Sequence, residues 1–249
     1  MADAFTLTGY GYSGPGEADE EIKVYRHELK YFISFTNYQI LSTLLRAHMQ
    51  MDPNCIGKKN NSYWIRSLYF DTAGNKDFYE KQIGHSLRKK IRLRIYDVNQ
   101  RFAKLEIKNK NDQFMMKETA ALSREDAEAL IRGSREVLFK PGLPILDRVF
   151  YLMSEHFYRP AILVDYYREA YVAPIQHIRI TFDKEIKASS VDFRLFDPDL
   201  QMQPVFDEPT MVLEVKFHRF LPNWIKGLLS SFAAERSAIS KYCLGRFIY

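Results

Sequence analysis

Charged and apolar side chains alternate through the stretch from Arg88 to Asp112, which is divided by a polar turn at residues 97–100. Before the turn, every second position is cationic: Arg88, Lys90, Arg92 and Arg94. After the turn, one parity carries Lys104, Glu106, Lys108 and Lys110. Because successive side chains of a strand point to opposite faces, this stretch is predicted to form a β-hairpin with one charged and one apolar face.

The same alternation recurs along the chain, so that at least five predicted strands carry charge on one face only. The clearest repeats are residues 24–34, 177–183 and 211–218. Residues 63–71 are predicted to form a strand from their aromatic and β-branched content. The segments 114–120 and 161–171 complete the set.

Helices are predicted between these strands. Thr36 and Gln39 form a predicted capping box for a helix to residue 49. Ser123 is predicted to cap a second helix that ends near Gly133. The remaining helical predictions are a turn at 77–82, a helix at 144–157, a helix after Pro222 and a final helix at 234–247.

Composition indicates one globular domain with a large core. The chain has 249 residues, 46% hydrophobic and 14% aromatic, without a repeat or a long linker. Lys and Arg number 36 against 31 Asp and Glu, a net charge of only +5, so the clustering of cations on strand faces matters more than their excess. Residues 1–21 are Gly-rich, acidic and without periodicity, which predicts a flexible tail before a domain at 22–249.

The two cysteines, Cys55 and Cys243, lie too far apart for a zinc or redox motif, and we expect a reduced, cytoplasmic protein. The start of the sequence has no apolar signal region, and no run approaches the roughly 20 apolar residues of a membrane-spanning helix. Any membrane association is therefore expected to need a membrane-protein partner.

The charged strand faces have two interpretations. In an open sheet they would point to water, which is the usual outcome for an alternating strand. In a closed barrel they would line the interior, where like charges repel and lose hydration unless they meet an oppositely charged ligand. Alternation alone does not decide between the two. Single-stranded nucleic acid is a weak candidate ligand, because the aromatic residues alternate mostly onto the apolar faces.

Nine short motifs, taken in order, resemble the polyphosphate polymerase domain of the vacuolar transporter chaperone (VTC) family, which belongs to the triphosphate tunnel metalloenzymes. The motifs are RHELKY (26–31), SLYFDT (67–72), RKKIRLRIY (88–96), LEIKNK (105–110), MKET (116–119), DYYREAY (165–171), RITFD (179–183), LEVKF (213–217) and SAISKY (237–242). Each motif alone is weak, but their order is specific, and the resemblance covers nearly all of residues 22–249.

The resemblance implies an α+β fold, in which a tunnel of about eight antiparallel strands is flanked by helices, a geometry that suits a barrel. It also implies an enzyme that uses Mn²⁺ or Mg²⁺ to transfer the γ-phosphate of ATP onto a growing inorganic polyphosphate chain. ATP and polyphosphate would be the partners, with no role for nucleic acid.

Site residues follow from the same motifs. The catalytic cations implied are Arg92, Arg94, Lys108, Arg168 and Lys241. The substrate-binding residues are Lys30, Lys90, Lys117, Tyr166, Arg179, Lys216 and Ser240. Glu214 and Glu28 are the implied metal ligands, and Glu106 is expected to pair with a tunnel Arg and orient it. Hard divalent cations prefer carboxylate oxygens, and Mg²⁺ often takes one or two of them together with substrate phosphates.

The chain departs from the pattern of the hydrolytic tunnel enzymes at one position. Those enzymes start with Glu-x-Glu-x-Lys, whereas this chain has Arg26 in place of the first Glu and keeps Glu28 and Lys30. Lys110 stands where some polymerases have a His. The loss of one carboxylate favours a polymerase, but a tunnel-type triphosphatase and a polyphosphate or inositol pyrophosphate sensor without turnover stay open as alternatives.

Overall fold

The structure is a computed structural model that describes residues 26–111, 114–140, 142–174, 177–232 and 236–248. Its strands are β1 (Arg26–Ser34), β2 (Gln50–Met51), β3 (Tyr63–Asp71), β4 (Leu87–Ile95), β5 (Phe102–Asn111), β6 (Phe114–Ser123), β7 (Arg159–Ala173), β8 (Ile178–Ser189), β9 (Gln203–Pro204) and β10 (Thr210–His218). The α-helices are α1 (Phe35–His48), α2 (Lys76–Gln82), α3 (Arg124–Ile131), α4 (Pro144–Glu155), α5 (Asn223–Phe232) and α6 (Lys241–Phe247).

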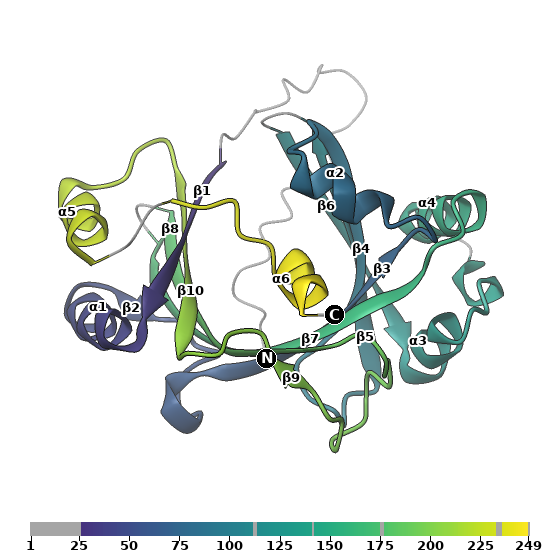
Figure 1. The fold of residues 1–249 in the computed structure, drawn as a ribbon, viewed down its shortest axis with the longest axis horizontal. Coiled ribbons are helices and arrows are strands. Elements are labelled where there is room, and N and C mark those ends of the chain that lie inside the picture. Colours follow the sequence, from purple (N-terminus) through teal and green to yellow (C-terminus); the bar gives the residue numbers. More distant parts are fainter. Residues whose placement is uncertain (1–25, 112–113, 141, 175–176, 233–235, 249) are drawn as a thin grey trace, which may run out of the picture.

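Eight strands form one antiparallel path in the order β1-β10-β8-β7-β3-β4-β5-β6, with β2 added beside β7 and β9 beside β8. The sheet is strongly curved: β1, β10 and β8 form one wall, β7 crosses below, and β4, β5 and β6 form the facing wall (Figure 1). The predicted tunnel-type fold of about eight strands with flanking helices is confirmed. Among the described residues, the ladder does not close between β1 and β6.

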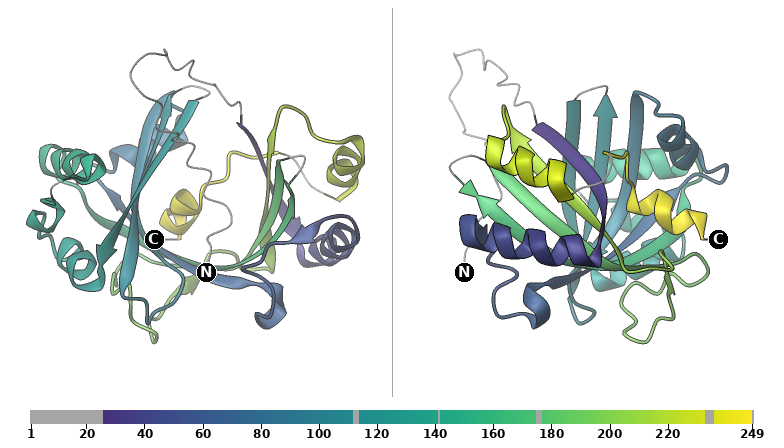
Figure 2. Two further views of the ribbon diagram at one scale, coloured as in Figure 1. Left: turned by 180° about the vertical axis from the view of Figure 1, so that it is seen from behind. Right: turned by 60° about the vertical axis from the view of Figure 1, so that its left-hand side comes forward.

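Apolar side chains pack on the outside of this curved sheet, beneath the helices. Leu105 and Ile107 of β5 share a buried cluster with Leu130 of α3 and Val149 of α4. The opposite wall packs against α1 and α5, with Leu41 and Leu213 in one cluster. Figure 2 shows these two helix pairs on the outer sides of the walls and α6 within the concavity. The charged faces therefore line the concave inner side of the sheet, which alternation alone did not predict.

Several predicted boundaries were wrong. The helix α1 is capped by Ser34, whose Oγ accepts from Asn37 N at 3.2 Å, and not by the predicted box of Thr36 and Gln39. The final helix begins at Lys241, because Ser237 N donates to Lys30 O at 2.9 Å and holds the preceding chain against β1. Residues 234 and 235 of that prediction lie outside the described residues.

Other elements follow the predictions more closely. Ser123 caps α3 as predicted, with Oγ accepting from Asp126 N at 3.1 Å. The strands β6, β7 and β8 run further than predicted, and the two-residue strands β2 and β9 were missed, because such short segments carry no alternation to detect. No described helix has the length and apolar character needed to cross a membrane.

Helix α6 packs directly on the inner face of β7 and β8 at Gly245. A Cβ atom built on Gly245 would lie 3.0 Å from both Ala188 Cβ and Ile162 Cγ1. Ala188 Cβ is fixed to a strand backbone and cannot rotate away. The absence of a side chain at position 245 therefore lets α6 approach the sheet closely, which places the first residues of α6 in the charged concavity.

Gly245→Ala is expected to destabilise the protein by about 1 kcal/mol, because overpacking outweighs the gain in helix propensity. Gly227→Ala is the matched control: Gly227 lies in α5, is exposed, and has nothing within 4 Å of its built Cβ, so Ala should stabilise by about 0.5 to 1 kcal/mol. Chemical denaturation of both variants measures the difference. Equal stabilisation by both substitutions would contradict the close packing of α6.

Candidate functional site

The β4–β5 hairpin presents its cations to the interior, as its alternation predicts. The register places four charged pairs side by side: Arg88 with Lys110, Lys90 with Lys108, Arg92 with Glu106, and Arg94 with Lys104. Glu106 is 1% exposed and accepts from Arg92 Nε at 2.5 Å, with Lys117 also in contact. Burial alone would raise the pKa of Glu106, but Arg92, Arg94 and Lys117 outweigh it and hold the pKa well below its usual range.

Strand β3 orients the two central guanidinium groups from the other side. Arg94 Nε donates to Ser67 Oγ at 3.0 Å, and Arg92 Nη1 donates to Tyr69 Oη at 3.1 Å. Burial would raise the pKa of Tyr69, but the surrounding cations, led by Arg92 and Arg94, lower it to about 8. Arg94 Nη2 also donates to Tyr166 Oη of β7, at 3.3 Å. Both arginines are thus fixed in place by neutral and acidic neighbours.

The opposite wall, from β1 and β10, carries carboxylates between lysines. Lys30 stands opposite Glu214 in the register, and Glu28 stands opposite Lys216. Lys30 Nζ lies 3.2 Å from Glu28 Oε1 and 3.4 Å from Glu214 Oε2, while Lys216 Nζ lies 2.5 Å from Glu214 Oε1. The predicted metal ligands are therefore neighbours within one ion-paired group.

Asp183 of β8 joins the two predicted catalytic cations that come from β7 and α6. It accepts from Arg168 Nε at 2.6 Å and from Arg168 Nη2 at 2.8 Å, and Lys241 contacts the same carboxylate. Asp183 is fully buried, which alone would raise its pKa, yet Arg168 and Lys241 lower the pKa to about 2. The sequence interpretation assigned Asp183 no role, although the residue shares the parity of Arg179 and Thr181 and ends the RITFD motif.

Lys108 belongs to β5 and lies on the same strand face as Glu106. Burial lowers its pKa well below the usual lysine range, and Arg92 and Lys216 lower it further, while Glu28 and Glu214 act in the opposite direction. Within the described parts of the chain, Lys108 has no carboxylate at ion-pair distance. The charges that act on Lys108 therefore come from both walls, Arg92 from β4 and Glu28, Glu214 and Lys216 from β1 and β10.

The remaining predicted residues lie around this centre. Lys90 Nζ donates to Ser240 Oγ at 2.6 Å. Lys117 and Lys216 are partly exposed to solvent. Arg179 Nη2 donates to Asp52 Oδ2 at 2.7 Å and to Tyr63 Oη at 3.2 Å, so it lies at the end nearer Arg168. The structure thus brings the predicted set together.

The wall of β1 and β10 has features that fit a divalent cation. Within the described residues, two buried side-chain oxygens, Glu214 Oε1 and Thr181 Oγ1, have no hydrogen-bond partner, and the two residues stand opposite each other in the β8–β10 register. The contact of Glu214 with Lys216 is an ion pair without hydrogen-bond geometry. The described residues contain no group of three or more acidic, His or Cys side chains of the metal-binding kind. Glu28 and Glu214 would therefore need phosphate oxygens to complete a coordination shell, as Mg²⁺ sites commonly do.

Comparison with known proteins agrees with this geometry. The sequence model of the VTC domain matches residues 25–248. The chain belongs to the VTC domain family. A search of curated proteins with this sequence found no match.

Solved structures of similar fold include a protein from Bacillus halodurans described as a candidate adenylate cyclase, with 11% identity, a TM-score of 0.51, and coverage of 86% of this chain and 91% of that one. Another is a candidate adenylyl cyclase from Hippeastrum, described as having a dominant triphosphatase activity, with 16% identity, a TM-score of 0.52, and coverage of 88% and 94%. At these identities the likeness shows the tunnel-type fold.

Asp183→Asn tests the buried group formed with Arg168 and Lys241. Because the pKa of Asp183 is lowered to about 2 in the folded protein, its contribution is present above the ordinary Asp pKa and is lost as the pH falls through about 4 to about 2. At neutral pH the variant should lose about 2 to 3 kcal/mol of unfolding free energy, since two buried cations lose their partner.

Denaturant unfolding of parent and variant across this pH range measures the effect, and the two stabilities should converge at the acid end. Asp199→Asn, at an exposed position, serves as the control and should follow the parent. A loss that is the same at every pH would show that the carboxylate charge of Asp183 is unimportant.

Proposed function

We propose that this protein is a polyphosphate polymerase that transfers the γ-phosphate of ATP onto a growing inorganic polyphosphate chain. The observation that carries the proposal is the gathering of Arg92, Arg94, Lys90 and Lys108 on the inner face of the β4–β5 hairpin, where burial and neighbouring cations lower the pKa of Lys90 and Lys108. A chain of phosphates supplies charge of the needed sign and spacing. The family match and the motif order support the same assignment.

The catalytic cations would hold the transferring phosphate and its neighbours. Arg92 and Arg94 are already oriented by Glu106, Tyr69 and Ser67, and a fixed guanidinium binds phosphate oxygens in bidentate fashion. Arg168 and Lys241 are oriented in the same way by Asp183. Lys108 would act from β5, on the same wall as Arg92 and Arg94. Substrate phosphates further along would contact Lys30, Lys90, Lys117, Tyr166, Arg179, Lys216 and Ser240.

Glu28 and Glu214 would hold the divalent cation, Mn²⁺ or Mg²⁺. When bound, the cation would supply positive charge that neutralises phosphate oxygens. Glu214 Oε1 favours this assignment, because it is buried, accepts no hydrogen bond from the described residues and is balanced only by the ion pair with Lys216. Lys30 and Lys216, which now balance the two carboxylates, would then be free to contact phosphates.

Transfer asks for alignment and charge neutralisation rather than covalent work by the protein. A terminal oxygen of the polyphosphate chain forms a bond to the γ-phosphorus, the bond from that phosphorus to the β–γ bridging oxygen breaks, and ADP leaves with the electron pair. The attacking oxygen is already an anion, so this reaction needs no general base.

Hydrolysis of triphosphate or nucleotides is the second candidate function, because one relative of similar fold is described as having a dominant triphosphatase activity. With water as the acceptor, a proton must be removed, and Tyr69 is a phenol of lowered pKa beside Arg92. A sensor that binds polyphosphate or an inositol pyrophosphate without turnover is the third.

Incubation with ATP and Mn²⁺, followed by gel analysis and a phosphorus NMR spectrum, separates these functions. Long chains with internal phosphate signals are the expected result. Orthophosphate alone would establish the hydrolase, and triphosphate binding without any metal-dependent ATP turnover would establish the sensor.

Glu214→Gln is expected to separate binding from turnover. The substitution keeps the shape of the side chain but removes the charge that would hold the cation. Binding of triphosphate without metal should persist or tighten, because a negative charge has left an anion site, while ATP turnover should fall by at least about a hundred-fold, in line with the loss of charge stabilisation in the transition state. Calorimetry and a phosphate-release assay measure the two effects. Turnover equal to that of the parent would show that Glu214 is structural.

A further inference from the structure

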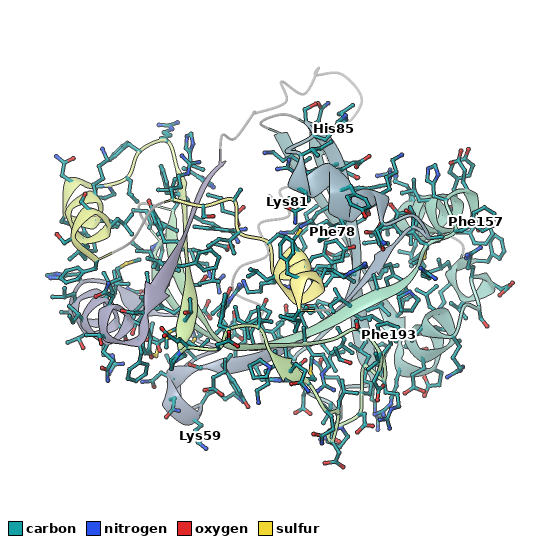
Figure 3. The ribbon with its side chains drawn as sticks, in the orientation of Figure 1. Lys59, Phe78, Lys81, His85, Phe157 and Phe193 are labelled. Atoms are coloured by element: carbon teal, nitrogen blue, oxygen red, sulfur yellow. The ribbon has the colours of Figure 1, made fainter. Side chains whose placement is uncertain are left out.

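Three lysines from three different elements converge on the segment that leads into α6. The hydrogen bonds are Lys81 Nζ to Ala238 O at 2.9 Å, Lys30 Nζ to Ile239 O at 3.3 Å, and Lys90 Nζ to Ser240 Oγ at 2.6 Å. Lys81 comes from α2, and Figure 3 shows it on the side of that helix nearest this segment. The sequence analysis singled out Ser240 and Lys241 at the start of α6 but not Lys81, because α2 lies outside the alternating strands.

Neutral oxygens accept from these lysines, so their charges are only partly offset. Lys30 has carboxylate partners in Glu28 and Glu214. Within the described residues, Lys81 and Lys90 have none. Burial lowers the pKa of Lys81, and so do Arg88, Lys30 and Lys110; burial together with Lys30 and Lys81 lowers the pKa of Lys90 to about 8. The lysines therefore repel one another at close range.

Arg88 extends this group along β4. It stands opposite Lys110 in the β4–β5 register, and its Nη1 donates to the backbone oxygen of His85 at 2.9 Å. Arg88 and Arg92 are four residues apart, about 13 Å along an extended strand. A triphosphate held at Arg92 is too short to reach Arg88, whereas a longer chain that follows the cationic face of β4 would pass Lys90 and then arrive there.

We propose that Lys81 and Arg88, together with Lys90, form a second anion-binding position at the rim of the tunnel, which holds the part of a polyphosphate chain that extends beyond the enclosed phosphates. This inference rests on the proposed function, since the enclosed site is taken to hold the first phosphates. Chain phosphates replace the neutral oxygens of residues 238–240 as partners of the rim cations. Affinity then increases with chain length because each added phosphate meets a further cation.

The double variant Lys81→Ala/Arg88→Ala tests the rim position against the matched control Lys76→Ala/Lys89→Ala. Both remove one cation from α2 and one from the start of β4, so the net charge falls equally. Lys76 is exposed and pairs with Glu80, and Lys89 lies on the opposite parity from Arg88. Calorimetry with triphosphate and with long-chain polyphosphate, at one ionic strength and without metal, gives the affinity of each protein for each ligand.

The rim variant should bind the long chain about ten-fold more weakly, for two partly exposed charge-assisted contacts, and triphosphate within about two-fold of the parent. The control should leave both affinities within about two-fold. Unchanged triphosphate binding also shows that the tunnel is still folded.

An equal loss for both ligands, or a long-chain affinity that the rim variant does not change, would overturn the rim position while leaving the proposed function in place. A parent protein that binds no triphosphate would overturn the proposed function and the rim position with it.

Discussion

Repulsion among enclosed cations is the constraint on which the structure depends. Side chains from β4, β5, β7 and α6 bring arginines and lysines into one space, where burial weakens their hydration and strengthens their mutual repulsion. Two carboxylates, Glu106 and Asp183, each neutralise part of this charge and fix the guanidinium groups beside them. Lys90 and Lys108 are left without such partners in the described chain. The described residues therefore leave part of this positive charge unbalanced, and we propose that a polyanion balances it.

The two walls differ in the charges that they carry. The wall of β4 and β5 is cationic apart from Glu106, whereas the wall of β1 and β10 places Glu28 and Glu214 between lysines. Phosphates are suited to the first wall and a divalent cation to the second, so that a metal-bound phosphate chain would be held from both sides. Helix α6 adds Ser240 and Lys241 from the concave side, and its close approach to β7 and β8 at Gly245 sets how far these residues reach.

The sequence predicted which residues share a face because strand alternation is strict: parity put Arg92 and Glu106 on the charged faces of their strands. Alternation did not predict whether these faces would enclose a space, and the order of the nine motifs was needed for that. Asp183 was missed because a single Asp at the end of an alternating strand looks like a solvated residue until Arg168 and Lys241 arrive from distant elements. The start of α6 was placed too early, since the contact of Ser237 with β1 is a tertiary interaction that helical spacing does not encode.

Unfolding free energies of the parent and of Lys108→Met, with and without triphosphate, test the central claim most directly. Met has a similar volume but no charge, so the empty variant should be more stable than the parent by about 1 to 3 kcal/mol, as is common when a buried charge is replaced by an apolar group. Triphosphate should stabilise the parent by about 2.7 kcal/mol at 100 times its Kd and should stabilise the variant clearly less at the same concentration. An empty variant that is less stable than the parent, or one that gains as much from triphosphate, would contradict the account, because Lys108 would then be neither repelled in the empty tunnel nor engaged by phosphate.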